Sequence, residues 1–226
     1  METKLSAAKK FFSWILGIIA ALAMIGCAMY SLGVFDFKDV RDVEKYPDAF
    51  GGYYSGQLVD NVREGHGEFS FKNGNKYSGE FAAGEFNGAG LFEAADGWSY
   101  EGEFVSGLPH GQGVFTDESG GVFEGYFEAG KITGVGTFQS SAEWIFDGMW
   151  DQGRQSGEGV FNYMDGSVYK GEFLNGAASG IGKYTDISGW SYNGGFLQGL
   201  FEGRGTLIFT NGEKLSGEWS AGVFVQ

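Results

Sequence analysis

The chain has 226 residues, of which 42 are glycine and 22 phenylalanine but only 2 are proline. This mixture excludes collagen, which needs glycine at every third position, and a disordered chain, which would lack aromatic side chains. The whole net charge of −14 falls on residues 50–226, which hold nine basic and twenty-three acidic side chains. Because such a surface repels phosphate backbones, nucleic acid is excluded as a partner.

A stretch without charge runs from residue 11 to residue 35, after a short tail of residues 1–10. As a helix it would measure about 37 Å, enough to cross a hydrocarbon core of about 30 Å. We therefore expect a transmembrane helix or signal anchor over 11–35, a single-pass membrane attachment, and a charged linker over 36–50. Lys9 and Lys10 favour an orientation that places the rest of the chain outside the cytoplasm.

Two alternatives for the N-terminus stay open. A cleaved signal peptide is one, although the apolar run is long for it and no good small-x-small cleavage site precedes the charged residues. Lipidation is the other, because Met24-Ile25-Gly26-Cys27 resembles a bacterial lipoprotein processing site. Cys27 is the only cysteine, so the chain forms no internal disulfide.

A 23-residue repeat fills residues 51–226. Glycine stands at +2 from the first residue of all eight units, and at +11 and +13 in the seven complete ones, with large apolar and mostly aromatic side chains at +4 and +15. Such self-similarity indicates an array of identical structural units. The units begin at Tyr54, Tyr77, Tyr100, Phe123, Phe146, Tyr169, Tyr192 and, for a partial unit, Leu215.

Within a unit the rings and glycines alternate with a period of two, which predicts two strands with rings on one face. The fold class is therefore all-β, an elongated single-layer antiparallel array of about sixteen strands. Phe69 lies opposite Tyr77 if the link between units has three residues, Lys72-Asn73-Gly74, with Gly74 left-handed. A wider loop, such as 107–111, is expected inside each unit, and Glu143 replaces the glycine of the fourth link.

The glycines have a predicted packing role. A ring at +4 or +15 could lie flat across a neighbouring glycine, so that rings of successive units form a stacked row. The opposite face is predicted to be polar and acidic, with glutamate at +3 as Glu80, Glu103, Glu172 and Glu218.

The pattern Tyr-x-Gly-Glu-Phe-x-x-Gly, followed by Gly-x-Gly-x-Phe, occurs in residues 100–115. This pattern, repeated every 23 residues, resembles the MORN (membrane occupation and recognition nexus) repeat. The resemblance extends from Tyr54 to Gly222. The resemblance implies a scaffold or protein-interaction module, or association with lipid. Family members that are enzymes carry a separate catalytic domain, which we expect to be missing here because four residues follow Gly222.

Residues with catalytic chemistry are few. His66 and His110 occupy different places in their units, and no Gly-Lys-Ser/Thr ending or Gly-x-Ser-x-Gly motif occurs. We expect no catalytic, cofactor or metal site, and hence a non-enzymatic, membrane-tethered scaffold that binds a protein partner. Lipid binding is the alternative, and an enzyme with an unknown substrate a remote one. The candidate interaction surface is the ring face: Tyr77, Phe81, Tyr100, Phe104, Phe127, Trp150, Tyr169, Phe173, Tyr192 and Phe196.

Overall fold

The computed structural model describes residues 38–49 and 51–226. The membrane span predicted over 11–35, with Cys27, lies outside these residues. The described part of the chain contains no helix, and so none that is long and apolar enough to cross a membrane. It divides into a large unit, residues 42–58 and 62–226, and a small one that includes residues 38–41 and 59–61. In the small unit the backbones of Asp39 and Asp60 are hydrogen-bonded at 2.9 Å.

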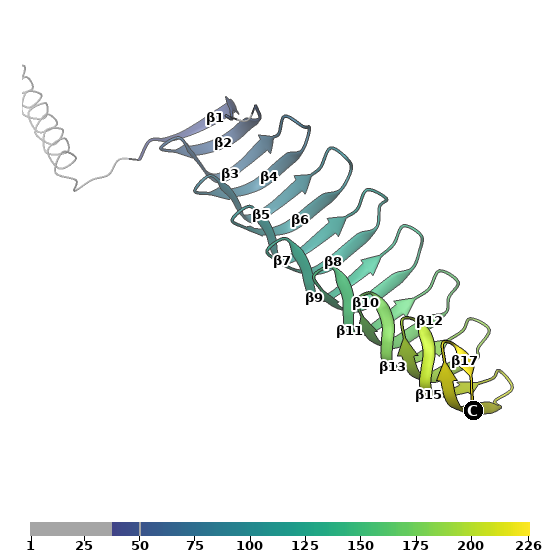
Figure 1. The fold of residues 1–226 in the computed structure, drawn as a ribbon. Coiled ribbons are helices and arrows are strands. Elements are labelled where there is room, and N and C mark those ends of the chain that lie inside the picture. The colour runs from purple at the N-terminus through teal and green to yellow at the C-terminus, as the bar shows by residue number, and fades with distance from the viewer. Residues whose placement is uncertain (1–37, 50) are drawn as a thin grey trace, which may run out of the picture. The chain divides into compact units, whose positions relative to one another are not determined.

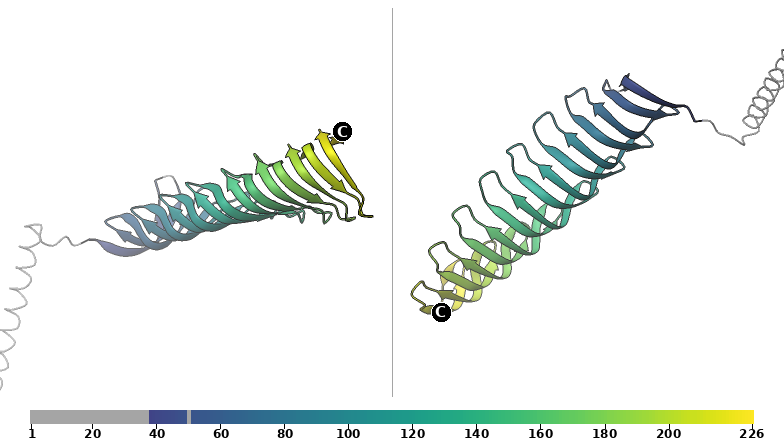
Figure 2. Two further views of the ribbon diagram at one scale, coloured as in Figure 1. Left: turned by 90° about the horizontal axis from the view of Figure 1, so that it is seen from below. Right: turned by 180° about the vertical axis from the view of Figure 1, so that it is seen from behind.

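The structure confirms an all-β antiparallel array, with seventeen strands instead of about sixteen. Each strand pairs with the next one in the chain, so the hairpins follow one another along a single twisted sheet (Figures 1 and 2). The strands are β1 (Val40–Pro47), β2 (Tyr53–Val59), β3 (Val62–Ser70), β4 (Lys76–Ala82), β5 (Glu85–Glu93), β6 (Ser99–Val105), β7 (Leu108–Thr116), β8 (Val122–Glu128), β9 (Lys131–Gln139), β10 (Ile145–Asp151), β11 (Arg154–Asn162), β12 (Val168–Leu174), β13 (Ala177–Thr185), β14 (Ser191–Leu197), β15 (Leu200–Ile208), β16 (Lys214–Ser220) and β17 (Val223–Phe224).

The array begins half a unit before the first aromatic of the repeat. Strand β1 lies within the stretch assigned from the sequence to a charged linker, and it pairs with β2. The turn after it has the hydrogen bonds of the later links, from the N–H of Asp48 to the carbonyl of Gly52 and from the N–H of Gly51 to the carbonyl of Asp48. Residues 40–49 and 51–52 therefore belong to the second half of an incomplete repeat that starts the sheet.

The links between units have the predicted three-residue form. Phe69 pairs with Tyr77, and Phe71 donates its N–H to the carbonyl of Asn75 at 2.9 Å. Gly74 is left-handed, with φ of 94°. The fourth link keeps this geometry although it lacks the glycine, because Glu143 itself adopts a φ of 66°. The rings at 0, +4 and +15 therefore stay on one face of the sheet, whereas Tyr53 and Tyr126 alternate with buried residues and lie on the other face.

The loop inside each unit is tighter than predicted. In place of a wide glycine-bounded loop, two residues connect the strands, and both have positive φ, as in Ala83 (51°) and Gly84 (86°). This is the type I′ turn that matches the twist of a hairpin. The glycine four residues later, such as Gly88 with φ of 75°, belongs to β5 and marks a register shift opposite Glu80. The +11 glycine is therefore a bulge residue within a strand.

In the seven complete units the glycines at +2 and +13 make room for the leading aromatic, where the sequence predicted a ring at +4 or +15. A ring at +15 lies against a glycine at Gly52, which meets Phe69, and at Gly121, which meets Phe138. A Cβ on Gly102 or on Gly113 would lie 2.5 Å from the hydroxyl of Tyr100. The phenol lies across both glycines and donates a hydrogen bond to the carbonyl of Glu103 at 3.0 Å. The hydroxyl of Tyr77 does the same to Glu80 at 2.8 Å.

The rings interlock edge to face and do not form the predicted stacked row. Tyr100 meets Phe104 of its own unit at 5.1 Å between ring centroids and 85°, and Phe127 of the next unit at 4.8 Å and 73°. This arrangement suits the ring quadrupole better than face-to-face stacking. We call this chain of rings the herringbone core: Tyr77, Phe81, Tyr100, Phe104, Phe123, Phe127, Phe146, Trp150, Tyr169, Phe173, Tyr192, Phe196 and Trp219.

The phenols of the herringbone core predict a loss of stability at alkaline pH. Burial raises the pKa of Tyr77, Tyr100 and Tyr169 to about 12. The unfolded chain releases these protons near pH 10 while the folded chain retains them, so stability falls as pH rises from 10 towards 12. We expect the melting temperature, followed by circular dichroism, to drop over this range. Replacing all three tyrosines by phenylalanine should weaken the drop, and an unchanged drop would contradict this explanation.

Candidate functional site

All ten residues of the predicted interaction surface lie in the herringbone core. Their exposed fractions run from 0 % at Tyr192 to 8 % at Trp150. Each ring is covered by its neighbours in two units and, at some positions, by the residue at +9, as where Phe86 stacks on Tyr77 at 3.8 Å. Binding of a partner to the ring face stays a prediction. Because these ten rings are buried, a partner would contact other, more exposed rings on that face.

A second row of rings on the same face is only half-buried. It is made of side chains at +15, +17 and +21, and it packs against the herringbone core. Neighbouring members are in contact within two runs, from Phe71 to Phe115 and from Phe138 to Trp190, as in the pair Trp144 and Phe161, stacked at 5.1 Å and 14°. We call it the aromatic border: Phe71, Phe92, Trp98, Phe115, Phe138, Trp144, Phe161, Tyr163, Tyr184 and Trp190.

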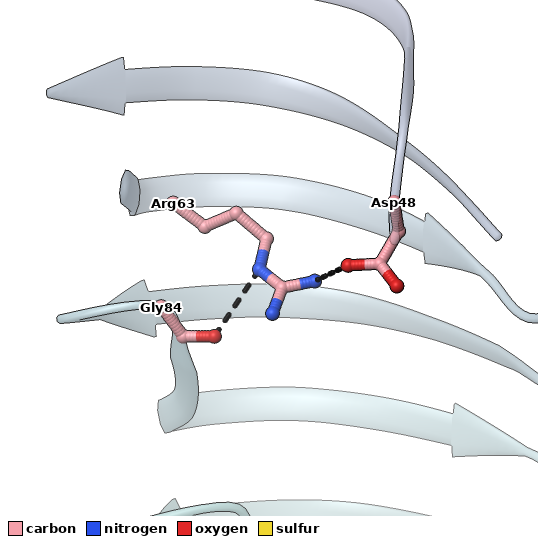
Figure 3. Close-up of polar contacts among 3 residues, drawn as sticks. All are labelled: Asp48, Arg63 and Gly84. Atoms are coloured by element: carbon pink, nitrogen blue, oxygen red, sulfur yellow. Dashed lines mark hydrogen bonds and ion pairs between the residues drawn. The ribbon is translucent and has the colours of Figure 1, made fainter. Parts of the chain in front are cut away.

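A cavity of about 400 Å³ opens at the start of the aromatic border. Its apolar walls are Phe69, Phe71 and Phe86. Arg63 crosses it, donating from Nε to the carbonyl of Gly84 at 3.1 Å and pairing with a carboxylate oxygen of Asp48 at 3.5 Å (Figure 3). The guanidinium carbon lies 4.8 Å from the ring centroid of Phe69. The guanidinium of Arg63 therefore lies between the ring of Phe69 and the carboxylate of Asp48.

A smaller cavity of about 340 Å³ lies further along, against Trp98 and Phe115. Its other residues are Asp117, Glu118 and Ser119, in the link that follows β7. The Asp117 oxygen Oδ1 accepts hydrogen bonds from the Ser119 hydroxyl at 2.7 Å and from the N–H groups of Ser119 and Gly121 at 2.8 Å. These bonds lower the pKa of Asp117, the hydroxyl most of all. The site presents a fixed anion beside two rings.

The opposite face is less uniformly acidic than predicted. The four glutamates expected at +3 are exposed. Those at 103 and 172 fold over the bulge glycine of their unit, since a Cβ on Gly111 would come within 2.6 Å of the Glu103 carboxylate. In the middle of the array, however, the exposed side chains of this face include Val135, Met149 and Ile181, around a shallow depression of about 570 Å³.

The two histidines of the array do not come together. His66 is exposed and His110 half-buried, in separate repeat units. In residues 38–49 and 51–226 no three His, Cys, Asp or Glu side chains group to hold a metal ion. The cavities are lined by rings, glycines and a few charges, which suits binding.

The fold and its surface define a repeat protein made of 23-residue β-hairpins that stack into one sheet around a core of interlocked rings. The chain belongs to the MORN repeat family. Seven consecutive stretches match the MORN repeat: residues 54–76, 77–99, 100–122, 123–142, 146–168, 169–191 and 192–214. The fourth match ends at residue 142, directly before Glu143, which replaces the link glycine. Comparison with curated protein sequences gave no significant match.

Several solved structures align with most of this chain at low identity. The TCP domain of SAS-4 (dCPAP) from Drosophila melanogaster, in complex with a proline-rich motif of Ana2 (dSTIL), aligns with 78 % of this chain and 88 % of its own, at 12 % identity and a TM-score of 0.42. The TCP10 domain of CPAP from Danio rerio aligns with 79 % of this chain and 89 % of its own, at 10 % identity and a TM-score of 0.33. At such TM-scores the likeness defines neither a common fold nor a common function.

Proposed function

We propose that this protein is a non-enzymatic scaffold that binds a protein partner along its aromatic border. The observation that carries the proposal is the two runs of partly exposed rings along one face of the sheet, from Phe71 to Phe115 and from Phe138 to Trp190. Aromatic side chains that are partly exposed and held in place are enriched at protein interfaces, where they add contact area at a low cost in conformational entropy.

Membrane attachment is part of the proposal. The uncharged residues 11–35 would tether the array, and Lys9 and Lys10 favour an extracytoplasmic array. Binding to an anionic lipid surface is less favoured, because the acidic charge of residues 50–226 would be repelled by it. A topology reporter fused after Gln226 would show on which side of the membrane the array lies.

Site-specific photocrosslinking in the host cell tests the recognition role. A photoreactive amino acid would replace either Tyr163, in the aromatic border and 39 % exposed, or Met149, on the opposite face and 47 % exposed. We expect discrete crosslinks to other proteins from position 163 and none to other proteins from the matched position 149. Crosslinks to other proteins from position 149 alone, or crosslinks from position 163 to a photoreactive lipid alone, would contradict the proposal.

A further inference from the structure

The charge of the opposite face changes sign along the array. Residues 77–130 contain ten acidic side chains and no lysine or arginine, and their exposed carboxylates on this face include Glu80 in β4 and Glu101 in β6. The exposed basic side chains on the later strands of the same face are Lys170 in β12, Lys183 in β13 and Arg204 in β15. One face of the chain therefore carries an acidic and a basic region.

Two of these basic side chains repel each other. Lys170 and Lys183 lie directly opposite on neighbouring strands, a position in which like charges destabilise a sheet. Within residues 38–49 and 51–226 neither lysine forms an ion pair, and the carboxylate of Glu172 accepts the N–H of Ile181 at 3.0 Å instead. A carboxylate from outside this part of the chain would relieve the repulsion.

The same face is apolar between the acidic and the basic region. Val135 in β9 lies opposite Met149 in β10, and both side chains are exposed, Val135 at 62 %. Together with Ile181 of β13 they line the shallow depression. Tyr126 of β8 adds exposed apolar surface on the side of the acidic region. An exposed apolar patch with charged residues at its rim is typical of a protein interface.

We propose that two copies of this chain associate through their opposite faces, in antiparallel order, about a two-fold axis that runs along the strands between β9 and β10. A two-fold interface uses the same surface of both copies, so one face must carry both complementary regions. Two sheets that pack face to face keep their strands nearly aligned. With this axis β9 faces β10, β6 faces β13 and β4 faces β15 of the second copy.

This register joins unlike charges across the interface. Rotation about an axis along the strands keeps each side chain at its height on the strand. Glu101 has the place in its unit that Lys170 has in a later one, and Lys170 pairs with Lys183. Lys183 of each copy therefore faces Glu101 of the other. By the same reasoning, Arg204 of each copy faces Glu80 of the other.

The association goes beyond the proposed recognition role and leaves it possible. The aromatic border lies on the ring face of the sheet, so both borders of the dimer point away from the interface. Each dimer would thus present two aromatic borders to partners.

The first test is a charge reversal in the full-length protein. Sedimentation velocity in a detergent of matched density measures the monomer–dimer equilibrium, and we expect a reversible dimer that weakens as salt is raised. Lys183→Glu places a carboxylate opposite Lys170 of its own sheet, so the melting temperature should not fall. Its dimer should dissociate at least about tenfold more readily, because the new carboxylate faces Glu101 of the other copy. Lys72→Glu changes the net charge equally at an exposed link and should have no effect.

The second test mixes two variants. Glu101→Lys alone should weaken the dimer as Lys183→Glu does. An equal mixture of the two variants should associate as tightly as the unaltered chain, because both contacts of the mixed dimer then join opposite charges. Within one chain the strands β6 and β13 are about 34 Å apart by strand spacing, so restoration on mixing requires contact between two copies.

Three results would overturn the proposal: a monomeric unaltered chain, an equal loss in Lys72→Glu, and a mixture that stays dissociated. The first would leave the two lysines to an acidic segment of another protein or to an anionic headgroup. In the host cell, the photoreactive residue at position 149 should give a crosslinked product with the mass of two copies of this chain. Crosslinks from position 149 to another protein would also contradict the proposal.

Discussion

Gly102→Val is expected to destabilise the array by about 3 kcal/mol or more, as overpacking at a site that cannot relax. A Cβ at this position would lie 2.5 Å from the Tyr100 hydroxyl and 2.7 Å from both the Cα of Gly113 and the carbonyl oxygen of Gln112. Two of these three atoms are backbone of the paired strand β7 and cannot move without breaking the register. Urea unfolding followed by far-UV circular dichroism measures the change in the free energy of unfolding.

The control for this variant is Gly120→Asn. Gly120 has φ of 86°, and a Cβ added there would meet no atom within 4 Å, so only the backbone conformation restricts this position. Asparagine tolerates left-handed φ, and Asn61 adopts 66° in a turn of the same array. We expect a cost below about 1 kcal/mol. Equal costs for the two variants would show that the glycine at +2 is not needed to make room for the ring.

The two kinds of glycine explain what the sequence could and could not predict. The period of two correctly placed the rings at 0, +4 and +15 on one face, and the parity of Phe69 and Tyr77 correctly required a three-residue link. The sequence pattern did not separate glycines with left-handed φ, such as Gly88, from those that make room for a ring, such as Gly102. Both kinds of glycine recur at fixed places in the repeat. The register shift of β5 shows that Gly88 is a bulge residue, and the sequence does not reveal that shift.

Strand β1 escaped the repeat pattern because its signature residues have changed. The places of the +11 and +13 glycines hold Asp42 and Glu44, so this half of the unit retains only Tyr46, at the +15 place, and Gly51, at the place of the link glycine. Pairing with β2 supplies the order that the local sequence does not specify. An aromatic and a link glycine, each one period before those of the first complete unit, were the signals that could have extended the array.

The sequence predicted on which face of the sheet the rings lie, but not which of those rings are exposed. Alternation shows which face a ring lies on, whereas its exposure depends on how rings of adjacent units interlock. The aromatic border was missed because its members at +17 and +21 do not recur in every unit. Trp98, Trp144 and Trp190 stand in alternate units, with Gly121 and Ser167 between them.

Phe104→Ala tests whether the interlocked rings hold the array together. The ring is 3 % exposed and meets Tyr77 and Tyr100 edge to face, at 5.1 Å each. Truncating a buried phenylalanine removes its burial and leaves a cavity, so we expect a loss of about 3 to 5 kcal/mol. Because each unit contacts only its neighbours, the loss should fall on the interface between the units that begin at Tyr77 and Tyr100.

Val105→Ala is the matched control, since Val105 follows in the same strand on the opposite face and is 47 % exposed. It should cost less than about 0.5 kcal/mol. Hydrogen exchange on Phe104→Ala should show lost protection concentrated in β4 to β7, on either side of the cavity. A uniform loss of protection along the array, or similar costs for the two variants, would mean that stability does not depend on ring contacts between neighbouring units.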